Sequence, residues 1–165
     1  MNANGTPDEN AASTEEAAAP TLAVVAQYVK DLSFEVPGAP AIYAIMQEKQ
    51  PEITVNIDVK ANPLEGEMFE VVLNIQATCN IDGNPAFVGE LSYGGVFTVT
   101  GPGEILQPIL LIECPRLLFP FARNIIADAT RDGGFPPLML APVDFAAMFQ
   151  NQLAQQAAAE QGDTA

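Results

Sequence analysis

The side chains that could act as nucleophiles are few and isolated in this sequence. The two cysteines, Cys79 and Cys114, are far apart, and no CxxC pair is present. The chain contains no histidine, so neither cysteine can be activated by one, and Ser13, Ser33 and Ser92 cannot form a histidine triad. Hydrolysis by these routes is therefore excluded, and we interpret both cysteines as packing residues.

Closely spaced carboxylates are the next group that could do chemistry. Glu65 with Glu67, and Asp128 with Asp132, could in principle form a two-carboxylate or divalent-metal site. Each pair is also explained by a solvated turn or a solvated helix face, which is the interpretation we favour. We therefore expect no catalytic residue and no metal site.

The glycine-rich segments do not form a phosphate-binding loop. Gly94 and Gly95, and the stretch 101–103, lack the fingerprint spacing and the following Lys-Ser or Lys-Thr. We expect the protein to use no ATP and to bind no other cofactor.

The chain is strongly acidic, with 21 acidic residues against six basic ones and a formal net charge of −15. The bias persists between residues 21 and 158, so it belongs to the folded body as well as to the ends. Such a charge repels nucleic acid and anionic lipid. It either serves solubility alone or attracts basic partners.

No apolar run approaches the roughly 20 residues of a membrane-spanning helix, and residues 1–20 do not have the pattern of a signal peptide. We therefore expect a cytoplasmic protein without membrane insertion. Residues 1–20 and 159–165 have almost no large apolar side chains, which predicts disordered acidic tails around one domain, residues 21–158.

Alternation with period two predicts four strands in the first two thirds of the domain. In the first, residues 28–35, Tyr28, Leu32 and Phe34 would share one face and Val29, Asp31, Ser33 and Glu35 the other. The others would lie at 53–59, 69–77 and 87–100, with turns at Asn62-Pro63 to Gly66 and at Asp82-Gly83. Four consecutive strands imply an antiparallel meander.

Helical spacing predicts two helices after the strands. The first covers residues 116–131 and stops at Gly133-Gly134, and the second follows Asp144 as its N-cap. An extended, proline-rich connector separates them. The sequence therefore predicts an α+β domain in which a four-stranded antiparallel sheet carries two main helices on one face.

Large apolar side chains are concentrated between residues 115 and 149, with few charges among them. One sheet face and two helices need not bury them all, so part of this region could form an exposed apolar groove. The residues concerned are Leu117, Leu118, Phe119, Phe121, Phe135, Leu138, Met139, Leu140, Phe145 and Phe149.

Three segments resemble the SecB family of protein-export chaperones over roughly residues 24–153. They are residues 28–37 (YVKDLSFEVP), 113–123 (ECPRLLFPFAR) and 134–145 (GFPPLMLAPVDF), which occur in the family's order. The resemblance implies an ATP-independent, non-enzymatic chaperone, assembled as a homotetramer, a dimer of dimers. It would hold unfolded secretory precursors in a translocation-competent state and deliver them to the SecA motor.

The resemblance also assigns residues to roles. It implies a motor contact at Asp31, Glu35, Val88 and Glu90, and a tetramer interface at Gly89, Leu91 and Tyr93. It places the client groove in the apolar region above, with Phe87 added: Phe87, Phe119, Phe121, Phe135, Leu138, Leu140, Phe145 and Phe149. Family members also reach the motor's zinc-containing segment with a C-terminal tail, but residues 157–165 here are short, acidic and free of lysine and arginine.

Four other functions remain open at this level. The chain could be a general holdase or a chaperone associated with toxin and antitoxin control. It could also be a small-ligand enzyme built on a helix-covered sheet, or a purely structural oligomer. A nucleotide-independent effect on client folding would separate the chaperones from the last two.

Overall fold

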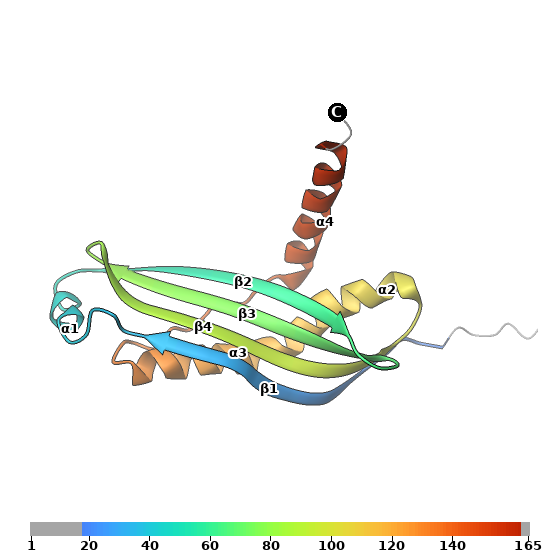
Figure 1. Cartoon of the computed structure of the whole chain (residues 1–165), viewed down its shortest axis with the longest axis horizontal. Helices are drawn as coiled ribbons and strands as arrows, with labels where there is room; N and C mark the ends of the chain where they lie inside the picture. The colour runs from blue at the N-terminus through green and yellow to red at the C-terminus, as the bar shows by residue number, and fades with distance from the viewer. Residues whose placement is uncertain (1–17, 163–165) are drawn as a thin grey trace, which may run out of the picture.

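The computed structural model describes residues 18–162, which form one antiparallel sheet with helices on one of its faces (Figure 1). The strands are β1 (Thr21–Glu35), β2 (Pro51–Pro63), β3 (Met68–Ile81) and β4 (Asn84–Thr100). The predicted α+β class with a four-stranded antiparallel sheet is confirmed. The opposite face, called the open face below, is not covered by any described element (Figure 1).

Turn chemistry fixes the register of the central hairpin. Asp82 and Gly83 both have positive φ, 52° and 77°, as a two-residue hairpin turn requires, and Ile81 pairs with Asn84 across it. The β2–β3 turn contains Gly66 at φ 63°. Both predicted turns are confirmed. The strands are longer than the alternation indicated, because residues at their ends also pair with the neighbouring strand.

The strand order is β1-β4-β3-β2, so the expectation of a simple meander was wrong. Only β2, β3 and β4 follow one another. Residues 36–50, with the short helix α1 (Ile42–Ile45), carry the chain across the end of the sheet, and β1 therefore pairs with β4. This leaves β1 and β2 as the two edges.

The predicted faces of Tyr28 and Val29 were also wrong, because β1 contains a bulge at Lys30. Val29 pairs with Tyr93 and Asp31 with Ser92, so Lys30 is an extra residue in the ladder. Tyr28, opposite Gly94, consequently lies on the open face, whereas Leu32 and Phe34 lie on the helix face. Asp31, Ser33 and Glu35 share the open face, as the alternation predicted.

The helical layer begins at Gly103, earlier than the predicted start at Arg116. It comprises α2 (Gly103–Pro108), a π-helical turn η1 (Ile109–Glu113) and α3 (Cys114–Asp132), which together form one continuous helical segment. Three prolines lie within this segment: Pro108, Pro115 and Pro120. Pro115 occupies the first turn of α3, directly after the π-helical turn η1.

The second helix, α4 (Phe145–Gly162), begins at the predicted cap. The Ala147 backbone N–H donates to Asp144 Oδ1 at 2.9 Å. Only the first turns of α4 pack on the body, and the rest projects away from the sheet (Figure 1).

The core lies between the helix face of the sheet and α3. Leu73, Ile75 and Leu91 from the sheet are buried with Leu118 and Ile126 from α3. A second cluster at the α1 end joins Ile42, Cys79, Phe87 and Phe135. The helix Gly103–Asp132 is long and apolar enough, by length and composition, to cross a membrane, and a third of its most apolar stretch is buried against the sheet, including Leu118 and Ile126 in this core.

Residues 1–17 and 163–165 lie outside the described residues, so the predicted tails fall largely beyond the structure. Residues 159–162 belong to α4.

Candidate functional site

Three hollows follow the edge strand β2 on the helix side, and we call them together the β2 groove. From one end of β2 to the other, they adjoin Pro51 and Ile53, then residues 57–59, then residues 59–63. Among the described residues β2 pairs only with β3, so its outer edge leaves backbone N–H and C=O groups free to bind an extended segment.

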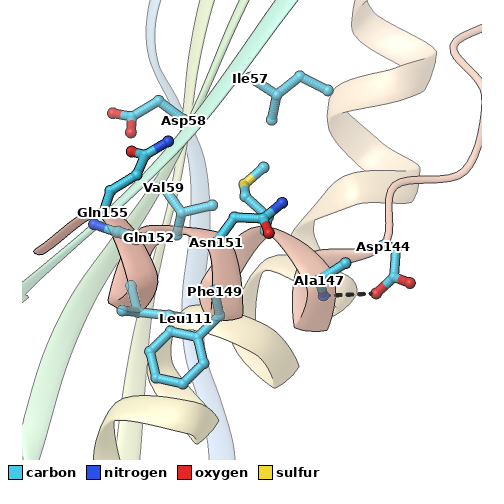
Figure 2. Close-up of a pocket in the computed structure, with 11 residues that line it drawn as sticks. Ile57, Asp58, Val59, Leu111, Asp144, Ala147, Phe149, Asn151, Gln152 and Gln155 are labelled. Carbon is cyan, nitrogen blue, oxygen red and sulfur yellow. Dashed lines mark hydrogen bonds between the residues drawn. The ribbon is translucent and has the colours of Figure 1, made fainter. Parts of the chain in front are cut away.

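The central hollow, of about 540 Å³, lies between β2 and the start of α4. Figure 2 shows Ile57, Asp58 and Val59 from β2 together with Phe149, Asn151, Gln152 and Gln155 from α4. Its lining is therefore mixed, with apolar side chains beside amides. The Asp144 cap on Ala147 fixes where α4 begins, and so positions this wall (Figure 2).

The hollow at the start of β2, of about 280 Å³, is almost entirely apolar. Phe87 and Phe135 meet edge to face at its base, with ring centroids 5.1 Å apart. Its outer wall is the 136–138 connector, which Thr130 holds in place by accepting from the Leu138 N–H at 2.8 Å. The Thr130 hydroxyl thereby satisfies a backbone N–H of the extended connector, which has no neighbouring strand to pair with among the described residues.

The third hollow, of about 390 Å³, continues past Val59 to the end of β2. Lys60, Phe69 and Gln107 contribute to its lining, and Leu111 and Gln152 line it together with the central hollow. The shared residues show that these two hollows are neighbouring parts of one groove.

The structure places the eight predicted groove residues in three different environments. Phe87, Phe135 and Leu138 line the apolar hollow, and Phe149 lines the central one. Phe121 of α3 is half exposed and stacks on Tyr93 of β4. The remaining three are core residues of the single chain: Phe119, Leu140 and Phe145.

Sequence reasoning missed the contribution of β2 to the groove. The alternation of Ile53, Ile57 and Val59 predicted a strand but no groove, and Ile53 is 45% exposed because β2 is an edge. Alternation can show which face is apolar, but it cannot show that a strand is at an edge. The amide side chains of α4 that line the central hollow are Asn151, Gln152 and Gln155. Nothing in the sequence distinguished them from other polar residues of a helix.

The four residues that the family resemblance assigned to a motor contact meet on the open face. Glu35 pairs directly with Val88, Ser33 with Glu90, and Asp31 with Ser92. Because paired residues in an antiparallel ladder share a face, Asp31, Glu35, Val88 and Glu90 form one patch, called the acidic patch below. It is flat, exposed at its carboxylates and half-buried at Val88.

A second carboxylate region on the open face is neutralised internally. Lys30 Nζ donates to Glu70 Oε1 at 2.7 Å, and the Tyr28 hydroxyl donates to Glu70 Oε2. The bond from Lys30, followed by that from Tyr28, lowers the pKa of Glu70. Burial, with the bond to Glu70, raises the pKa of Tyr28 to about 12. The acidic patch has no such ion pair among the described residues.

The predicted interface residues of β4 lie on the helix face within the chain's own core. Leu91 is only 2% exposed, and Phe34 lies over Gly89. The Tyr93 hydroxyl donates to Gln27 Oε1 at 3.2 Å while its ring stacks on Phe121.

The remaining candidates for chemistry have structural roles. Burial raises the pKa of both the Cys79 and Cys114 thiols, the latter to about 12, which disfavours the thiolate. Asp128 pairs with Arg131, and Glu65 and Glu67 lie in the β2–β3 turn. No group of three metal-ligating side chains gathers anywhere between residues 18 and 162.

A helix-backed antiparallel sheet with an apolar groove along a free strand edge and an acidic open face defines a protein-binding module. Comparison with known proteins specifies it further. The family model described as "Preprotein translocase subunit SecB" matches residues 15–156. The chain belongs to the SecB family of protein-export chaperones, which are not enzymes.

Two relatives illustrate the match. The chain is 54% identical over 157 residues to a protein-export protein SecB of Granulibacter bethesdensis, covering 90% of this chain and 91% of the relative. It is 57% identical over 143 residues to that of Mesorhizobium japonicum, covering 86% and 85%.

A solved structure shares the fold. A SecB-like chaperone of Mycobacterium tuberculosis, in complex with a ChAD peptide from an antitoxin, aligns with a TM-score of 0.57 and 17% identity. The alignment covers 74% of this chain and 90% of that one.

Proposed function

We propose that this protein holds unfolded secretory precursors in the cytoplasm, without nucleotide, and delivers them to the SecA motor. The β2 groove is the observation that carries the proposal. It combines apolar hollows with a free strand edge, so an extended client can add backbone hydrogen bonds while its apolar side chains enter the hollows. Folded proteins, most of whose backbone groups are already paired, offer few extended segments that could bind in this way.

The groove favours many clients over one. Its hollows differ in character, from the apolar one beside Phe135 to the amide-lined one beside Gln152, and they are open along β2. Binding through main-chain groups and loosely shaped apolar surface tolerates sequence variation.

Handover to SecA is proposed to use the acidic patch. Its carboxylates are exposed and have no ion-pair partner in the described chain, while Val88 supplies apolar area between them. A patch of this kind accelerates the association of a basic partner, and salt weakens it above roughly 0.1 M, where the Debye length is about 10 Å.

Assembly into a homotetramer, a dimer of dimers, is part of the proposal. Exposed apolar side chains along the edge strand β1 (Val25, Val29 and Leu32) and on α3 (Leu117 and Phe121) support contact with other copies. The contribution of β4 to assembly would then be indirect. Phe34 packs over Gly89, and Phe121 stacks on Tyr93, so β4 residues including Leu91 would support the side chains that contact another copy.

The holding function is tested by refolding a slow-folding precursor with increasing amounts of chaperone and no nucleotide. Refolding should slow in proportion to the chaperone, and Phe149→Ser should reduce the effect. Leu153→Ser is the control, because Leu153 is a more exposed apolar residue of the same helix that lines none of the hollows described. Refolding that is unaffected, or slowed only with ATP, would refute the proposal.

A pull-down from cytosol separates the proposed export role from a general one. Enrichment of signal-bearing precursors together with SecA supports export. Enrichment of antitoxins, or of unfolded proteins without signal sequences, would instead point to toxin control or to a general holdase.

A further inference from the structure

The open face contains a polar hollow next to the acidic patch that the proposed contact residues do not account for. It measures about 260 Å³ and lies across β2, β3 and β4. Six polar side chains line it: Asn56, Asp58, Asn74, Gln76, Glu90 and Ser92. Glu90 belongs to both the hollow and the acidic patch, so the two are continuous.

Strand register explains why the face is hollowed here. Asp31, Ser92, Asn74 and Asp58 form one rung across the four strands, and Ser33, Glu90, Gln76 and Asn56 form the next. The short side chains of Ser92 and Asn74 occupy the middle of the first rung. Ser92 Oγ donates to Asn74 Oδ1 at 2.7 Å, and Gln76 Nε2 donates to Glu90 Oε1 at 3.3 Å.

The charge of the hollow is negative. Asp58 has no ion-pair partner in the described chain, and the bond from Gln76 to Glu90 is between a neutral donor and a carboxylate. Lys60 is the next residue of β2 on the same face, but it makes no ion pair with Asp58. Glu70, by contrast, is neutralised by Lys30 on the other side of the same face.

The same charge argues against two possible occupants. A second copy of this chain carries a net charge of −15, and its residues 1–17 contain four acidic and no basic residues. Either would be repelled by the uncompensated carboxylates. A lysine or arginine side chain from another protein has the complementary charge and can donate to several acceptors at once.

We propose that this hollow extends the docking surface for the motor, and that Asp58 is a further contact residue that receives a lysine or arginine side chain of the partner. The inference rests on the proposed role of the acidic patch. It widens the docking surface from β1 and β4 to the far edge strand β2. The partner would therefore span all four strands of the sheet.

The test compares SecA affinity and client holding for matched variants at low and high salt. Asp58→Asn should weaken SecA binding by about threefold or more at low salt, and by less at high salt, as expected for an exposed charge pair. Glu65→Gln is the control, because it removes one exposed carboxylate from the β2–β3 turn and changes the net charge equally. SecA affinity is measured with no client bound, because Asp58 also lines the central hollow of the β2 groove. Client holding should be unchanged in Glu65→Gln.

A second variant fills the hollow from within. Asn74→Arg introduces a guanidinium beside Asp58 and Glu90, and should compete with the partner's cation. Circular dichroism verifies that the Asn74→Arg variant folds. Asp58→Asn tests the same contact without a larger side chain, so both variants should show reduced SecA affinity.

A triple variant, Asp31→Asn with Glu35→Gln and Glu90→Gln, separates failure of the inference from failure of the proposed docking. If the triple variant loses SecA binding while Asp58→Asn and Asn74→Arg bind like the unaltered protein, the hollow is not part of the surface. If the triple variant also binds normally, the docking face itself is refuted, and the hollow with it.

Discussion

The ring of Tyr28 lies against Gly94 on the open face, and a Cβ at residue 94 would be only 2.7 Å from a ring carbon. Glycine is therefore required at this point for packing. The contact exists because the Lys30 bulge turns Tyr28 onto the open face, opposite Gly94.

Gly94→Ala should destabilise the chain by about 1–3 kcal/mol, because the ring of Tyr28 must move from its hydrogen bond with Glu70. Gly103→Ala should be near neutral, since nothing lies within 4 Å of its added Cβ. Urea unfolding measures both. If Tyr28→Ala fails to restore part of the loss in the double variant, the clash is not with the ring.

Lys30→Met should make stability less dependent on pH at the acid end. The pKa of Glu70 is lower in the folded chain than its unfolded value of about 4.3. The ionised, paired carboxylate therefore stabilises the fold above that value, and the contribution is lost as pH falls through the lowered folded pKa. Thermal unfolding between about pH 3 and pH 7 measures the effect.

In the variant, the drop in melting temperature over the acid range should be smaller than in the unaltered protein. An identical pH profile would show that Lys30 does not set the pKa of Glu70.

Leu91→Asp should unfold the chain, and should not simply separate its copies. The side chain is 2% exposed and packs in the main core, where an unpaired carboxylate costs on the order of several kcal/mol. Leu117→Asp, at a 42% exposed position of α3, should leave the fold intact and lower the mass in solution.

Light scattering with circular dichroism distinguishes these outcomes. A folded Leu91→Asp variant of reduced mass would contradict the core assignment, and a folded Leu117→Asp tetramer would remove that residue from the assembly surface.

Asp144→Ala should destabilise the start of α4 by about 1 kcal/mol, because the Ala147 N–H loses its cap. Client holding should weaken with it, since α4 forms one wall of the central hollow. Hydrogen exchange at residues 145–149 reports the fraying directly. Asp144→Ser retains a capping oxygen and should behave like the unaltered protein.

The sequence by itself determined the class of the fold and the positions of most of its turns and helix ends. Period-two alternation located all four strands, Asp82-Gly83 and Gly133-Gly134 located two breaks, and Asp144 located the start of α4. These signals are local, because they depend on the conformations that a few neighbouring residues allow. The family could also be inferred from three short segments.

Only the tertiary structure decided which strands are edges and which side chains face the groove. Placing β1 beside β4 depends on the path of residues 36–50, and the face of Tyr28 depends on one bulged residue. Neither has a local signature, because alternation is the same for a central strand and an edge strand. The exposure of Ile53 in the β2 groove, and the burial of Phe119 and Phe145, follow from how the layers pack.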